Sequence, residues 1–82
     1  MERNIWSIEA FGTDNICRND YIHDDDILCE VLSNDDVDED GDVVYRCRSL
    51  VDFSEISAAG DPITIQEGET FIWSAHGIYK PK

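Results

Sequence analysis

Positively charged side chains are scarce in this sequence. Six Lys and Arg residues stand against nineteen Asp and Glu residues, which gives a formal net charge of −13 at pH 7. Nucleic acids and anionic membranes would repel such a chain, so the composition argues against direct binding to either. The excess of like charge also destabilises any compact state through self-repulsion.

Long apolar runs and an export signal are missing too. No stretch approaches the roughly 20 consecutive apolar residues that a membrane-spanning helix needs. The segment from Met1 to Trp6 contains no apolar core typical of a signal peptide, and Glu9 interrupts the nearest candidate. We therefore expect a cytoplasmic protein. The cysteines are few and odd in number, so we expect free thiols rather than a disulfide framework. They are Cys17, Cys29 and Cys47.

Signatures of catalysis and of bound cofactors are also lacking. The sequence contains no nucleophile elbow, no phosphate-binding loop and no metalloprotease helix. No pair of cysteines or histidines shows the two-to-four-residue gap that is typical of structural zinc sites. We therefore expect a protein that is not an enzyme and that carries no cofactor.

The apolar content, by contrast, is that of a folded protein. Hydrophobic residues make up 41% of the chain and aromatic residues 10%, whereas disordered acidic chains are poor in both. The length of 82 residues suits a single domain spanning residues 1–82.

The clearest strand pattern lies on either side of an acidic turn. Residues 43–51 alternate polar Arg46 and Arg48 with apolar Tyr45 and Cys47, the period of a half-buried strand. We predict that residues 27–33 pair with this strand as a hairpin. Residues 25–34 could alternatively form a helix, because their apolar residues also fit one helical face.

The remaining elements are assigned from local signals. Residues 4–11 are rich in strand-forming residues and are closed by Gly12, whereas residues 12–26 are expected to form a long loop. The spacing of Asp52 and Glu55 resembles a capping box and predicts a short helix there. Residues 63–66 and 70–74 flank a turn around Gly68 and are predicted to pair as a second hairpin. The expected fold is mainly β, with four or five short antiparallel strands and one short helix. The alternative is α+β, with residues 25–34 helical.

Acidic residues are concentrated in one part of the chain. Twelve of the nineteen carboxylates fall between Asp14 and Asp42. In an extended strand, alternate residues lie about 6.6–6.8 Å apart on one face. Asp36, Asp38, Asp40 and Asp42 have this spacing in the sequence and are predicted to form such a row. Carboxylates in such a row could occupy a groove whose Lys and Arg side chains normally contact phosphates.

The carboxylates that carry a resemblance to a known type of protein are Asp20, Asp24, Asp25, Asp26, Asp35, Asp36, Asp38, Glu39, Asp40 and Asp42, on a compact domain that contains aromatic residues. With these residues the chain resembles the small acidic DNA-mimic proteins of bacteriophages and mobile elements, which include anti-restriction and anti-CRISPR proteins. The resemblance covers size and charge over the whole chain and involves no sequence motif. It implies a non-enzymatic inhibitor, active in the cytoplasm of a host cell, that binds the basic surface of a nucleic-acid-binding protein. We expect the partner to be bound through Asp20, Asp24, Asp25, Asp26, Glu30, Asp35, Asp36, Asp38, Glu39, Asp40 and Asp42.

The same acidic segment suggests a second hypothesis, a calcium-binding module. Asp36, Asp38 and Asp40 match ligand positions 1, 3 and 5 of a calcium loop, Gly41 matches position 6, and Asp42 follows directly. Position 12 is Cys47 instead of Glu, so at most weak calcium binding is expected. A third hypothesis is a structural or assembly subunit whose charge serves only solubility.

Overall fold

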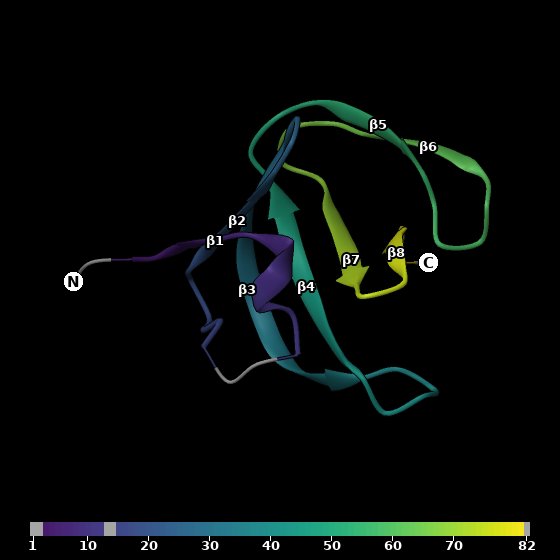
Figure 1. Cartoon of the computed structure of the whole chain (residues 1–82). Coiled ribbons are helices and arrows are strands. Elements are labelled where there is room, and N and C mark those ends of the chain that lie inside the picture. Colours follow the sequence, from purple (N-terminus) through teal and green to yellow (C-terminus); the bar gives the residue numbers. More distant parts are fainter. Residues whose placement is uncertain (1–2, 13–14, 82) are drawn as a thin grey trace.

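The protein is built almost entirely from β-strands. The computed structural model describes residues 3–12 and 15–81 (Figure 1). A six-stranded mixed sheet has the order β1-β2-β3-β4-β7-β8, and a separate two-stranded sheet consists of β5 and β6. The expected mainly β fold is therefore confirmed, but the strand count was too low. The strands are β1 (Ile5–Trp6), β2 (Tyr21–Asp24), β3 (Ile27–Val37), β4 (Val43–Ser49), β5 (Phe53–Ile56), β6 (Pro62–Ile65), β7 (Thr70–Ser74) and β8 (Gly77–Tyr79).

The hairpin of β3 and β4 is the longest pairing in the sheet, and it confirms the predicted hairpin. Val31 lies opposite Cys47, and Val37 lies opposite Val43, with two register shifts between Val31 and Asp36. The alternative helix over residues 25–34 is wrong. The inward-facing residues of this segment are Ile27, Cys29 and Val31, two apart, which is the period of a strand.

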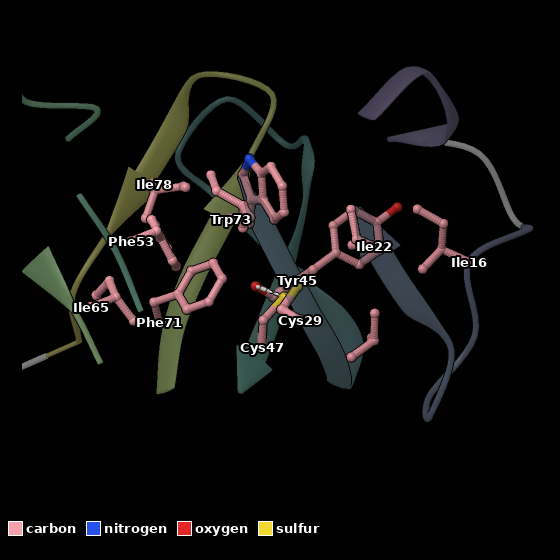
Figure 2. Close-up of a cluster of buried hydrophobic side chains, with 12 residues drawn as sticks. Ile16, Ile22, Cys29, Tyr45, Cys47, Phe53, Ile65, Phe71, Trp73 and Ile78 are labelled. Carbon is pink, nitrogen blue, oxygen red and sulfur yellow. Dashed lines mark hydrogen bonds between the residues drawn. The ribbon is translucent and has the colours of Figure 1, made fainter. Parts of the chain in front are cut away.

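The core lies against one face of the six-stranded sheet. Trp73, Phe71 and Tyr45 are its largest fully buried side chains (Figure 2). Phe11 covers one end of this face, with ring centroids 4.9 Å from Tyr45 and 5.3 Å from Trp73. The two-stranded sheet covers another part, where Phe53 packs edge-on against Phe71 at 5.4 Å. Aromatic rings from distant segments therefore hold the two sheets together.

The first predicted strand is mostly not a strand. Only Ile5 and Trp6 pair, in parallel with Tyr21 and Ile22 of β2. The chain then turns into a 3-10 helix, η1 (Ile8–Ala10), which is its only described helix. The predicted loop over residues 12–26 contains β2, so this expectation was wrong as well.

None of the described residues forms a helix long and apolar enough to cross a bilayer.

The predicted helix at Asp52–Glu55 is wrong, because these residues lead into and form β5. The Asp52 carboxylate caps a different element, accepting a hydrogen bond of 2.7 Å from the Glu67 backbone N–H. The hydroxyls of Ser54 and Thr64 face each other across β5 and β6 at 3.2 Å. Asp52 therefore caps a backbone N–H group as predicted, but that group lies fifteen residues away and not in a following helix.

The second predicted hairpin has the right strands and the wrong pairing. β6 pairs with β5, whereas β7 pairs with β4 and β8. The turn between β6 and β7, with Gly68 at φ +91°, connects the small sheet to the large sheet. Ser49 of β4 holds this turn in place. Its N–H donates to the Glu69 carbonyl at 2.9 Å, and its carbonyl accepts from the Gly68 N–H at 2.8 Å. Residues 50–69 therefore leave and re-enter the large sheet at neighbouring strands.

The cysteines are free thiols in different environments. Cys17 is exposed, whereas Cys29 and Cys47 are buried on the inner face of the sheet (Figure 2). The neighbouring Cys29 side chain, and burial after it, raise the pKa of the Cys47 thiol far above its ordinary value. A buried neutral thiol is a poor nucleophile, because the thiolate is the reactive form.

Thiol titration checks this assignment. We expect the native protein to react rapidly at one thiol, Cys17, and the denatured, non-reduced protein to react at all three. The variant Cys17→Ser should abolish the rapid native reaction and leave two thiols after denaturation. Fewer than three reactive thiols in the denatured parent would reveal a disulfide and contradict the expectation.

Candidate functional site

The strongest concentration of charge lies at the end of the β3–β4 hairpin. Six carboxylates occur within residues 35–42, which we call the acidic end. Figure 1 shows this loop extending beyond the body of the sheet. Asp35 and Asp36 belong to β3, whereas residues 38–42 form the connecting loop. The carboxylates of the acidic end are Asp35, Asp36, Asp38, Glu39, Asp40 and Asp42.

The loop of the acidic end is a tight turn and not an extended strand. The Asp38 N–H donates to the Asp42 carbonyl at 2.9 Å, and the Gly41 N–H donates to the Asp38 carbonyl at 3.1 Å. Gly41 adopts φ +84°, a left-handed conformation that glycine accommodates without strain. The predicted row of Asp36, Asp38, Asp40 and Asp42 at strand spacing is therefore wrong, because the turn draws the last three together.

The Asp38 carboxylate organises this turn. Its Oδ1 accepts hydrogen bonds from the backbone N–H groups of Asp40 at 2.9 Å and Asp42 at 3.0 Å. This Asx-type cap explains why an aspartate suits the first position of the loop. One carboxylate oxygen of each of Asp38, Asp40 and Asp42 lies within 4.8 Å of the others.

A histidine that the sequence analysis did not assign to any site reaches the acidic end from another hairpin. His76 lies in the turn between β7 and β8, where its N–H donates to the Ser74 hydroxyl at 3.1 Å. Its Nε2 lies 3.5 Å from Asp40 Oδ2, 3.5 Å from Asp42 Oδ2 and 4.0 Å from Asp38 Oδ2. Asp36, the first position of the hypothetical calcium loop, is not part of this cluster.

Lys and Arg side chains do not neutralise the acidic end. Within the described residues, no Lys or Arg nitrogen lies within 4.0 Å of its carboxylate oxygens. The described Lys and Arg ion pairs lie elsewhere, between Arg3 and Glu30 at 3.5 Å and between Lys80 and Glu69 at 3.5 Å. Among the described residues, the His76 imidazole is the only basic side chain with a nitrogen within 4.0 Å of these carboxylate oxygens.

The other predicted partner-binding residues do not join the acidic end. Asp24, Asp25 and Asp26 lie at the β2–β3 turn, separated from the acidic end by residues 27–34 of β3. Glu30 lies on the outer face of β3, opposite Arg48 and paired with Arg3. The predicted set thus divides into two exposed clusters, at opposite ends of one long strand, and one neutralised carboxylate between them.

Asp20 requires a correction, because it is a structural residue and not a surface one. It is only 6% exposed. Its Oδ2 accepts hydrogen bonds from the Trp6 indole at 2.9 Å and the Cys17 N–H at 3.0 Å, and its Oδ1 accepts from the Asn4 N–H at 3.2 Å. Burial alone would raise the pKa of Asp20, but these hydrogen bonds and the charge of Arg3 outweigh it and lower the pKa.

Comparison with known proteins does not extend this picture. No protein-family model, curated protein or solved structure matches the chain.

The variant Asp20→Asn should be destabilised by about 1–3 kcal/mol at neutral pH, because one of the two acceptor oxygens becomes an amide NH2 group that faces a donor. Since the pKa of Asp20 is lower in the folded state, its ionised form stabilises the fold above the unfolded pKa of about 3.9. This stabilisation is lost as the pH falls through the lowered folded pKa. Urea unfolding at neutral and acidic pH measures the difference between parent and variant.

The matched control is Asp26→Asn, which removes one exposed carboxylate at the β2–β3 turn. This variant should change the free energy of unfolding by less than about 0.5 kcal/mol. An equal loss in both variants at neutral pH would show that Asp20 has no special structural role.

Proposed function

We propose that this protein is a non-enzymatic inhibitor that binds the basic surface of a nucleic-acid-binding protein through its acidic end. The observation that carries the proposal is the set of six carboxylates in residues 35–42, for which no Lys or Arg partner lies within 4.0 Å in the described part of the chain. Exposed charge without an internal counterion is free to pair with Lys and Arg of a partner. Such pairs favour rapid association and specificity.

The internal distribution of charge supports binding at an end of the molecule. The outer face of the six-stranded sheet carries Arg46 and Arg48, which are exposed on β4. Glu30 on the same face is paired with Arg3. This face would repel a basic groove, whereas the acidic end would attract it. The partner is therefore expected to approach along the hairpin, with its arginines against Asp35, Asp36 and Glu39.

Mimicry of nucleic acid is part of the proposal and follows from the chemistry of the partner. Arg side chains that hold phosphate also hold carboxylate, through similar charge-assisted hydrogen bonds. A protein bound there would exclude DNA or RNA from the same groove. This is the manner of action of the phage-type anti-CRISPR and anti-restriction inhibitors that the sequence resembles, and it would operate in the cytoplasm of a host cell.

A charge-matched pair of triple variants tests the proposal. The first combines Asp35→Asn, Asp36→Asn and Glu39→Gln, and the second combines Asp24→Asn, Asp25→Asn and Asp26→Asn. Both raise the net charge by three, but at opposite ends of β3. If each lost ion pair contributes about 0.2–1 kcal/mol, the first variant should bind its partner roughly 3- to 150-fold more weakly. Its dependence on salt should also become flatter.

The measurement starts with the immobilised protein and a nuclease-treated bacterial lysate. Retained proteins are eluted first with duplex DNA or RNA and then with salt, and the affinity of each is measured against both triple variants. We expect nucleic-acid-binding proteins in the first eluate. The proposal fails if nucleic acid releases nothing, or if the two triple variants bind as tightly as the parent at every salt concentration.

A further inference from the structure

The imidazole of His76 lies among three carboxylates and forms no short hydrogen bond with any of them. The Nε2 atom lies 3.5–4.0 Å from one oxygen of each of three aspartates. Ordinary N–H···O hydrogen bonds to carboxylates are about 2.7–3.2 Å long. The imidazole is thus placed too far from every carboxylate for a short hydrogen bond, yet it faces all three.

Two of these separations equal the spacing of ligands around a shared metal ion, and the others are slightly longer. Four ligands at about 2.0–2.2 Å from a tetrahedral zinc ion lie about 3.3–3.6 Å from one another. The four donor atoms of the cluster all lie within 4.8 Å of one another, and two of the nitrogen–oxygen separations are 3.5 Å. Small side-chain shifts would therefore bring all four donors to a common centre.

The electrostatics of the cluster favour a divalent cation. Three carboxylates converge there, and Asp38 exposes only 15% of its side chain. A protonated histidine would supply a single positive charge, and no described Lys or Arg lies within 4.0 Å. A divalent ion would offset more of the repulsion and satisfy all four donors at once.

From this geometry we infer that Asp38, Asp40, Asp42 and His76 form a binding site for a divalent transition-metal ion of the zinc type. The nitrogen donor and the set of four side chains distinguish it from a calcium loop, which uses six to eight oxygen ligands. Asp36 does not take part, so the ligand set is not the one that the sequence suggested. The inference does not rest on the proposed function, because Asp35, Asp36 and Glu39, which are expected to meet the partner's arginines, are not among the ligands.

Space for a further ligand lies beside the cluster. A surface hollow of about 620 Å³ is lined by Glu39, His76 and Tyr79, among others. This volume far exceeds the roughly 30 Å³ that one water molecule occupies in the liquid. A water molecule or a donor from a partner could therefore complete the coordination of the metal.

The test uses the full chain, freed of metal with a chelator and titrated with zinc chloride in a calorimeter. We expect one ion per chain and a rise in melting temperature with zinc concentration. The variants His76→Ala and Asp40→Asn should each weaken zinc binding by at least about tenfold. Cobalt(II) added in place of zinc should show the visible absorption of tetrahedral coordination, and His76→Ala should lose it.

The matched control is His23→Ala, which removes the only other histidine, an exposed residue on β2. It should bind zinc like the parent. Calcium should bind only in the millimolar range, and His76→Ala should leave that binding unchanged. The inference is overturned if the parent binds no zinc at micromolar concentrations, if both histidine variants lose it equally, or if His76→Ala binds zinc as tightly as the parent. A circular-dichroism melt of each variant shows whether it is folded. If His76→Ala does not fold, the loss of zinc affinity in Asp40→Asn tests the inference instead.

Discussion

Repulsion among nineteen carboxylates, opposed by only six Lys and Arg residues, is the constraint to which the rest of this structure conforms. The inner face of the large sheet is apolar, and most carboxylates lie at the ends of strands, in turns or, as Glu30 does, on the outer face. Asp20 is the buried exception, and three hydrogen-bond donors hold it in its ionised form. Stability thus depends on a core that compensates for the repulsion of the surface.

Local patterns in the sequence were sufficient for the central hairpin and insufficient for the rest of the sheet. The alternation around Cys47 and the turn-forming residues near Gly41 act between neighbours in the chain, so β3 and β4 could be predicted. After Gly68 the chain could pair with β6 as a local hairpin or with β4 of the large sheet. The sequence around Gly68 does not distinguish these pairings, and β7 pairs with β4. The error at Asp52 has the same origin, because its capping partner belongs to a later turn.

The candidate site was predictable to the same extent. The acidic end is one continuous segment, and its charge is plain in the sequence. The convergence of Asp38, Asp40 and Asp42 follows from a turn that Gly41 and the Asp38 cap create. His76 could not be assigned to it, because its approach depends on the long-range register of β7 and β8. Spacing rules for metal sites detect ligands that are close in the sequence, so they do not detect a histidine that belongs to another hairpin.

The segment of residues 50–69, which connects β4 to β7 and contains the small sheet, affects the order of folding. Its two ends meet at Ser49, so β7 can dock on β4 only after a segment of this length has closed. The β3–β4 hairpin needs only its own short loop and can form earlier. That loop contains three converging carboxylates, which repel one another as the hairpin forms. We therefore expect the earliest folding step to be the one most sensitive to counterions. Ionic conditions should then change the rate of folding more than they change the stability of the folded core.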